Sequence, residues 1–251
     1  MQDSVVINQQ LIVYNILKNQ VSEKVLIFLH GWKSQGLVWK NVAEKISNQG
    51  FAVYMLDLPG FGNSPQPKSS FSVQDYADVV REFIKKLKLN NVVLVGHSFG
   101  GRIAINLASS EPALIKKVVL VAAAGLRTKK GSDKIVFLAK LAKPFFKPKF
   151  MAGLRKKIYK ALGSVDYIES GNLKETYLKV ASEDLSGYLS KISQSTLIIW
   201  GEDDKDTPLA FAKIMNEKIK NSKLVVLKEA GHFSFLDKPQ EFMEELTKFI
   251  R

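Results

Sequence analysis

The amino-acid sequence predicts an α/β fold: a mostly parallel sheet covered by helices on both faces, with a helical insertion. Short apolar runs alternate along the chain with segments of helical periodicity, an order typical of such a sheet. The 251 residues, 46% of them hydrophobic, suffice to bury one large core. One long segment past the middle of the chain contains helical patterns and no clear buried strand.

The first predicted element is a hairpin formed by residues 5–8 and 11–16, with Asn8-Gln9-Gln10 near its turn. Six further strands are nearly continuous apolar runs, as expected for strands buried on both faces: residues 25–29, 52–56, 92–95, 117–121, 196–200 and 224–227. Helical spacing predicts five helices between them: residues 38–48, 73–87, 102–109, 208–219 and 239–250. Pro208 and Pro239 suit first-turn positions, with Thr207 and Asp237 as possible caps.

The alternation of strands and helices stops between residues 125 and 191. Apolar residues near 150–162 follow helical spacing, and basic residues lie on the opposite side of the same helix. We therefore expect a core made of residues 1–124 and 192–251, and a helical cap made of residues 125–191.

The formal net charge of +13 belongs mainly to this cap. Between Arg127 and Lys160 there are twelve Lys or Arg residues and one acid, Asp133, whereas the rest of the chain is nearly balanced. A nucleic-acid binder would spread its basic residues over a face of the fold, so we expect no nucleic-acid partner. A solvated helix face is the default interpretation. Attraction of anionic substrates, or loose association with an anionic membrane surface, are the alternatives.

Targeting and redox features of the sequence are few. The N-terminus carries no basic patch followed by a long apolar stretch, which argues against a signal peptide. The longest apolar run, residues 118–126, is far shorter than the roughly 20 residues needed to cross a bilayer. A cytoplasmic protein is therefore expected. The absence of cysteine excludes disulfides, thiolate metal sites and a cysteine nucleophile.

The sequence Gly96-His97-Ser98-Phe99-Gly100 follows an apolar strand and precedes a helical segment. A serine in that context sits on a strained turn as a nucleophile, and small neighbours let strand and helix approach closely. The backbone N–H of Phe99 can then point at a developing oxyanion. A second N–H is expected from the loop His30-Gly31-Trp32, which also follows a strand, and we assign it to Trp32. For His30 we expect a structural role in this loop.

Two later loops supply candidates for the remaining catalytic groups. Asp203, Asp204 and Asp206 follow the apolar strand at residues 196–200, and each could orient a histidine. Of the three histidines in the chain, His97 lies next to the serine and His30 is assigned to a loop, which leaves His232 as general base. The order serine, aspartate, histidine along the chain is the one expected for this architecture.

These motifs together resemble the α/β-hydrolase superfamily along nearly the whole chain. The resemblance rests on His30-Gly31-Trp32, Asp57-Leu58-Pro59-Gly60-Phe61-Gly62-Asn63-Ser64, the motif around Ser98, the Gly201 to Pro208 loop and Gly231-His232. It implies an eight-stranded sheet with a helical cap after the sixth strand. It also implies that Asp204, three residues after Gly201, is the triad acid, with Asp203 and Asp206 as second choices. Members of the superfamily that use aspartate as the nucleophile on this turn, the nucleophile elbow, are excluded, because this chain has Ser98 there.

The sequence contains no metal or organic-cofactor motif, and in particular no phosphate-binding Gly-Lys-Ser/Thr loop, so we expect no cofactor. The leading hypothesis is a serine hydrolase, most simply a carboxylesterase for small or medium acyl substrates. A lyase or carbon–carbon bond hydrolase on the same scaffold is one alternative, because an arginine, Arg102, follows the glycines as in the menaquinone-pathway synthase that eliminates pyruvate. A ligand receptor that kept the fold without catalysis is another. Aromatic residues of the cap either line an acyl pocket or pack the cap onto the core: Phe137, Phe145, Phe146, Phe150, Tyr159, Tyr167, Tyr177 and Tyr188.

Overall fold

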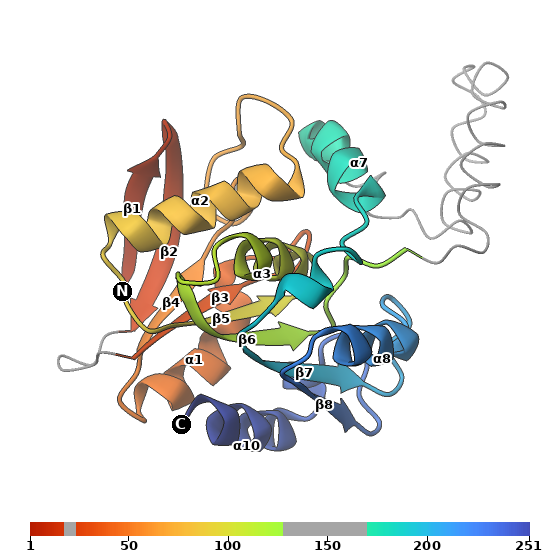
Figure 1. The fold of residues 1–251 in the computed structure, drawn as a ribbon. Coiled ribbons are helices and arrows are strands. Elements are labelled where there is room, and N and C mark those ends of the chain that lie inside the picture. Colours follow the sequence, from red (N-terminus) through yellow and green to blue (C-terminus); the bar gives the residue numbers. More distant parts are fainter. Residues whose placement is uncertain (18–23, 128–169) are drawn as a thin grey trace, which may run out of the picture.

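The computed structural model describes residues 1–17, 24–127 and 170–251. Its centre is a single eight-stranded sheet (Figure 1). The strands are β1 (Gln2–Ile7), β2 (Gln10–Leu17), β3 (Val25–Leu29), β4 (Ala52–Leu56), β5 (Val92–His97), β6 (Ile115–Val121), β7 (Ser195–Gly201) and β8 (Ser222–Leu227). All eight predicted strands are present. β3 and β4 match the prediction, and the other six are two residues longer because hydrogen-bonded pairing continues past the apolar run. β1 ends at Ile7 and not at Asn8, which lies in the turn.

The strands lie in the order β1-β2-β4-β3-β5-β6-β7-β8. The hairpin β1–β2 is antiparallel, and β2 pairs antiparallel with β4, whereas the six strands from β4 to β8 are parallel. Asn8 and Gln9 both have positive φ, 48° and 63°, as the tight two-residue turn between β1 and β2 requires. The mostly parallel sheet of the predicted α/β-hydrolase fold is confirmed.

Helices cover both faces of this sheet (Figure 1). One face packs against α2 (Val73–Lys86), α3 (Phe99–Ser110) and α8 (Leu209–Lys218). The other packs against α1 (Lys40–Ser47), α9 (Ser234–Asp237) and α10 (Pro239–Ile250), with the 3₁₀ helix η1 (Gly36–Trp39) leading into α1. The central strands β3 and β4 are buried along their entire length, so each face supplies one apolar core.

Helix ends follow local chemistry, and three of the predicted helix-end roles are not found. A capping box starts α2, in which Ser72 and Asp75 bond each other's backbone N–H groups. Pro239 occupies the first turn of α10 as predicted. Pro208, by contrast, is the N-cap residue of α8, and Lys238 rather than Asp237 caps α10. Thr207 caps no helix, because its hydroxyl is used at the site described below.

The predicted cap lies between β6 and β7, and residues 128–169 of it, with most of its basic charge, lie outside the described residues. Residues 170–191 form η3 (Gly171–Leu173), α7 (Lys174–Ser182) and η4 (Leu189–Lys191), with no strand among them. In the described part of the chain no helix is long and apolar enough to span a bilayer. The cytoplasmic location stays a prediction.

Candidate active site

The motifs singled out in the sequence gather at one edge of the sheet. His30-Gly31-Trp32 follows β3, Ser98 follows β5, and the loops that carry Asp204 and His232 follow β7 and β8. These four strands are parallel, so their carboxyl ends meet at the same edge, where the loops of open α/β sheets form binding sites (Figure 1).

Ser98 occupies a strained turn between β5 and α3. Its φ of 49° and ψ of −107° are a conformation that non-glycine residues rarely adopt. The glycines on either side permit this turn: a Cβ on Gly96 would collide with the carbonyl of Gly100, and a Cβ on Gly100 would lie 2.5 Å from the carbonyl oxygen of Leu29. The turn leaves the Ser98 side chain partly exposed at the start of α3.

Two backbone N–H groups near this turn are available to a ligand. Within the described residues, neither the N–H of Phe99 nor that of Trp32 donates a hydrogen bond. The start of α3, which carries the first, is joined to the loop that carries the second, because the N–H of Gly100 donates to the carbonyl oxygen of His30 at 3.1 Å. Phe99 is the first residue of α3, so the helix dipole adds a partial positive charge there.

His30 holds the first of these loops from inside the protein. It is fully buried, and its Nε2 accepts a hydrogen bond of 3.0 Å from the backbone N–H of Leu58. Nδ1 therefore carries the proton and donates to the carbonyl oxygen of Gly31 at 2.7 Å. Burial lowers the pKa of His30 to about 4, so the ring stays neutral. These bonds agree with the structural role expected for His30.

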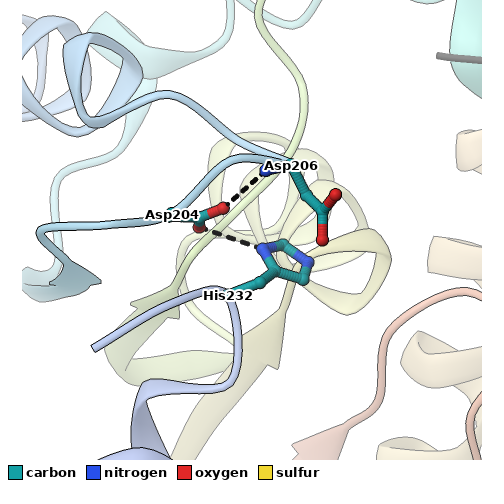
Figure 2. A group of neighbouring side chains, drawn as sticks. All are labelled: Asp204, Asp206 and His232. Carbon is teal, nitrogen blue, oxygen red and sulfur yellow. Dashed lines mark hydrogen bonds and ion pairs between the residues drawn. The ribbon is translucent and has the colours of Figure 1, made fainter. Parts of the chain in front are cut away.

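Asp204 and His232 lie in direct contact (Figure 2). The Nδ1 atom of His232 is 2.9 Å from Oδ2 of Asp204, and only 12% of the histidine side chain and none of the aspartate side chain is exposed. Because the carboxylate can only accept, Nδ1–H donates and Nε2 is left unprotonated in the neutral ring. An imidazole held this way presents a free basic nitrogen on its other side.

The loop around Asp204 keeps this carboxylate ionised. Its Oδ1 accepts from the backbone N–H groups of Asp206 and Thr207, each at 2.9 Å, and its Oδ2 also accepts from the Thr207 hydroxyl at 2.7 Å. Burial alone would raise the pKa of Asp204, but the hydrogen bonds from His232 and Thr207 outweigh it and hold that pKa below the ordinary value. Asp204 is thus a charged, fully hydrogen-bonded group behind the imidazole.

The other two predicted carboxylates have different surroundings. Asp203 and Asp206 are both exposed. Figure 2 shows the Asp206 carboxylate on the side of the imidazole away from Asp204, and ligand atoms of Asp204, Asp206 and His232 lie within 4.8 Å of one another. That is the one cluster in the described residues with the spacing of a metal site. Both oxygens of Asp204 already accept two hydrogen bonds each, which leaves that carboxylate poorly placed to bind a cation.

His97, the residue before Ser98, links the end of β5 to the loop that carries His232. No hydrogen bond joins the Ser98 hydroxyl to His232 in the part of the chain that the structure describes. Instead, Nε2 of His97 is 2.9 Å from the backbone carbonyl oxygen of His232, and the two imidazole centroids are 4.7 Å apart. The strand end that carries Ser98 is therefore joined to the loop that carries His232.

Aromatic rings surround the side chain of Trp32, the residue that carries the second of these N–H groups. The Trp32 ring contacts Phe61, Phe99 and Tyr177, with centroids 4.9, 5.1 and 5.3 Å away. Its indole N–H also donates to the Ser170 hydroxyl at 3.2 Å. Of the eight cap aromatics named from the sequence, only Tyr177 and Tyr188 lie within the described residues. Tyr177 contacts this cluster, whereas Tyr188 packs against the core.

The arginine that follows the elbow glycines binds protein groups. Nη1 of Arg102 donates to the carbonyl oxygens of Val180 and Glu183, at 2.9 and 3.0 Å, at the end of α7. Burial lowers the pKa of Arg102 to about 10, which leaves it charged at neutral pH. Arg102 thus ties the nucleophile helix to α7.

Sequence reasoning missed the roles of Thr207, His97 and Arg102. Thr207 was visible as a hydroxyl three residues after Asp204, a spacing that allows a local hydrogen bond, but it was assigned to helix capping. The partners of His97 and Arg102 lie 135 and 78 or more residues away, so no local signal pointed to them.

Comparisons with known proteins agree with the fold described above. Residues 26–245 match the model of the "Alpha/beta hydrolase family". The AB hydrolase superfamily protein YisY of Bacillus subtilis is 31% identical over 248 residues, covering 89% of this chain and 90% of that protein. Pimeloyl-[acyl-carrier protein] methyl ester esterase of Nitrosomonas europaea is 28% identical, covering 87% and 92%. An esterase of Exiguobacterium antarcticum shares the fold, with a TM-score of 0.80, 24% identity and coverage of 100% and 99%.

Proposed function

Because this chain belongs to the α/β-hydrolase family, we propose that it is a carboxylesterase that uses Ser98, His232 and Asp204 as a catalytic triad. The observation that carries the proposal is the 2.9 Å hydrogen bond between Asp204 and His232, at the same sheet edge as a serine held at a φ of 49°. A buried, ionised carboxylate behind a histidine and a serine on a strained elbow are the parts that serine hydrolysis needs.

In the proposed mechanism, Nε2 of His232 takes the hydroxyl proton as Ser98 attacks the ester carbonyl. Asp204 keeps Nδ1 protonated and stabilises the imidazolium that forms. The imidazolium then returns the proton to the departing alcohol, and a water activated by His232 releases the acyl group from Ser98. Hydrogen bonds between nucleophile and base commonly tighten only when substrate is bound, so the proposal does not require one between Ser98 and His232 in the free protein.

The oxyanion of each tetrahedral intermediate is proposed to accept hydrogen bonds from Phe99 and Trp32. Their backbone N–H groups have no other acceptor within the described residues, which supports this role. Preorganised donors of this kind lower the barrier because they need no reorganisation when charge develops. The loss of one such donor costs about 10²–10³ in rate.

We further propose a small-molecule ester with an apolar acyl group of small to medium size as substrate. The partly exposed rings of Trp32 and Tyr177 contact each other, and Trp32 packs on the buried rings of Phe61 and Phe99. Apolar rings at the residues that carry the proposed oxyanion donors support an apolar acyl site. Two of the similar proteins described above are named esterases, one of them for a methyl ester.

The lyase alternative rested on Arg102 as a shared feature. Since Nη1 of Arg102 bonds two backbone carbonyls at the end of α7, the structural role is the simpler explanation of that arginine. A non-catalytic receptor would have no need of a hydrogen-bonded Asp204–His232 pair, so we favour the esterase.

A panel of p-nitrophenyl esters of graded chain length, combined with fluorophosphonate labelling, tests the proposal. Wild-type protein should hydrolyse the shorter esters and take up one label, on Ser98. Ser98→Ala should lose labelling, and its kcat should fall by on the order of 10⁴–10⁶. Undiminished labelling of Ser98→Ala would contradict the triad. Labelling without hydrolysis of any ester would retain the nucleophile and favour a lyase or another bond type.

A further inference from the structure

His97 and His30 take no part in the proton transfers of the proposed mechanism, and of these two His97 is the one beside the nucleophile. It is the last residue of β5, directly before Ser98, and only 1% of it is exposed. Its Nε2 lies 2.9 Å from the backbone carbonyl oxygen of His232. A carbonyl oxygen can only accept, so Nε2 carries the proton and donates it. A buried side chain beside the nucleophile thus bonds the backbone of the general base.

The same ring also touches the loop that carries the Trp32 N–H. A Cβ placed on Gly31 would lie 2.9 Å from Nδ1 of His97, closer than side chains normally approach. The Gly31 backbone therefore packs directly against the imidazole. On its other sides the ring meets Phe233 and Phe235, with centroids 4.9 and 5.3 Å away. His97 is thus wedged between the loop after β3 and the loop after β8.

The protonation state of His97 suits a fixed donor. Burial, and secondarily the neighbouring His232, lower the pKa of His97 to about 3. The ring is therefore neutral throughout the pH range in which an esterase works, with its single proton on Nε2. A ring in that tautomer has no free basic nitrogen facing His232, so it cannot replace His232 as the base.

We propose that His97 is a positioning residue for catalysis: its Nε2–H holds the backbone of His232, which keeps that base aligned with Ser98. This inference rests on the triad proposed above. It differs from simple core packing because it makes the hydrogen bond to the His232 carbonyl, and not the filled volume, the property that catalysis needs. A displacement of about 1 Å at such a site can cost 10² in rate.

Three substitutions separate the hydrogen bond from the volume. His97→Gln places an amide N–H as many bonds from Cα as Nε2, so it can still reach the His232 carbonyl. His97→Asn carries the same amide one bond short of that position, and His97→Phe fills the space without a donor. We expect kcat of the Gln variant within about fivefold of wild type. For the Asn and Phe variants we expect kcat to fall about 10- to 100-fold, with KM within about twofold.

Ser234→Ala is the matched control. Ser234 is fully buried at the start of α9, two residues after His232, and its hydroxyl bonds nothing within the described residues. Its replacement should leave kcat and fluorophosphonate labelling at the wild-type rate. Thermal unfolding of every variant reports the packing cost separately. If kcat follows the melting temperature across the set, with Gln no better than Asn, His97 is a packing residue and the inference fails.

A double-variant measurement distinguishes failure of this inference from failure of the proposed function. If His97 acts through His232, His97→Phe should slow fluorophosphonate labelling of Ser98 about 10- to 100-fold in the wild-type background. In the His232→Ala background it should change the residual labelling rate by less than about twofold. An equal loss in both backgrounds overturns the positioning role while leaving the triad intact. Labelling that survives Ser98→Ala overturns the triad itself.

Discussion

Replacing Asp204 by asparagine tests the orientation of His232 at a single atom. Every neighbour of the Asp204 carboxylate is a donor. Oδ1 accepts two backbone N–H groups at 2.9 Å, and Oδ2 accepts the Thr207 hydroxyl at 2.7 Å and Nδ1–H of His232 at 2.9 Å. Asparagine has the same shape but offers only one acceptor oxygen. The two backbone N–H groups cannot change their protonation, so the amide oxygen must face them and the NH₂ group must face His232.

The expected consequence is a change of tautomer. With an N–H donor opposite Nδ1, the neutral imidazole of His232 moves its proton to Nε2 and can no longer take the Ser98 proton. In serine proteases the same exchange lowers kcat by about 10⁴, which corresponds to about 5.5 kcal/mol of transition-state stabilisation. We expect a loss of that size for Asp204→Asn with little change in KM.

The assay is kcat and KM on a short p-nitrophenyl ester, with the rate of fluorophosphonate labelling measured in parallel. Asp206→Asn is the matched control, because Asp206 is exposed and lies on the other side of the ring (Figure 2). It should keep kcat within about threefold, since an exposed carboxylate interacts weakly through water. An Asp204→Asn enzyme within tenfold of wild type, or a larger loss in Asp206→Asn, would refute this account of the site.

Three more predictions concern the scaffold. Gly100→Ala places a Cβ 2.5 Å from the Leu29 carbonyl oxygen, so urea denaturation should show a loss of about 1–3 kcal/mol in unfolding free energy. Arg102→Met leaves two carbonyls at the end of α7 without their donor, so hydrogen exchange in α7 should speed up and stability should fall by about 1.5–3 kcal/mol. Folding lowers the pKa of His30 to about 4 and of His97 to about 3 from an ordinary 6.5, so the unfolded chain binds protons first. The contribution of these two histidines to the unfolding free energy is therefore fully present above pH 6.5 and is lost as the pH drops toward 4. Denaturation curves of His97→Gln, measured across this pH range, should show a shallower fall of the unfolding free energy than those of wild type.

Much of the fold was predictable because its signals are local. Strands β3 and β4 carry unbroken apolar runs, and their ends were predicted to the residue. The start of α3 was predicted three residues late, at Arg102, because the helical pattern begins to repeat only after the elbow glycines. In the structure the helix begins at Phe99, immediately after the strained Ser98, which is what leaves the Phe99 N–H without an intrahelical acceptor.

The sequence predicted which residues form the candidate site better than it predicted the hydrogen bonds between them. Ser98, the aspartate loop and His232 could be identified because each follows a strand and because the parallel strands end at one edge. The choice of Asp204 over Asp203 and Asp206 came from resemblance, and the residues alone left it open. In the structure, Asp204 is the buried carboxylate and the one that hydrogen-bonds His232, which supports that choice.

The sequence by itself determined the α/β architecture and the strand-turn-helix context of Ser98, since apolar runs, glycines and helical periodicity act over a few neighbouring residues. Only the tertiary structure decided which groups meet across the sheet edge: the Nε2–H of His97 with the carbonyl of His232, and Arg102 with the end of α7. Such pairs join residues far apart in the chain, and a hydrogen bond forms only when both groups come within about 3 Å in the right orientation. That distance follows from the packing of whole elements, which no local pattern encodes.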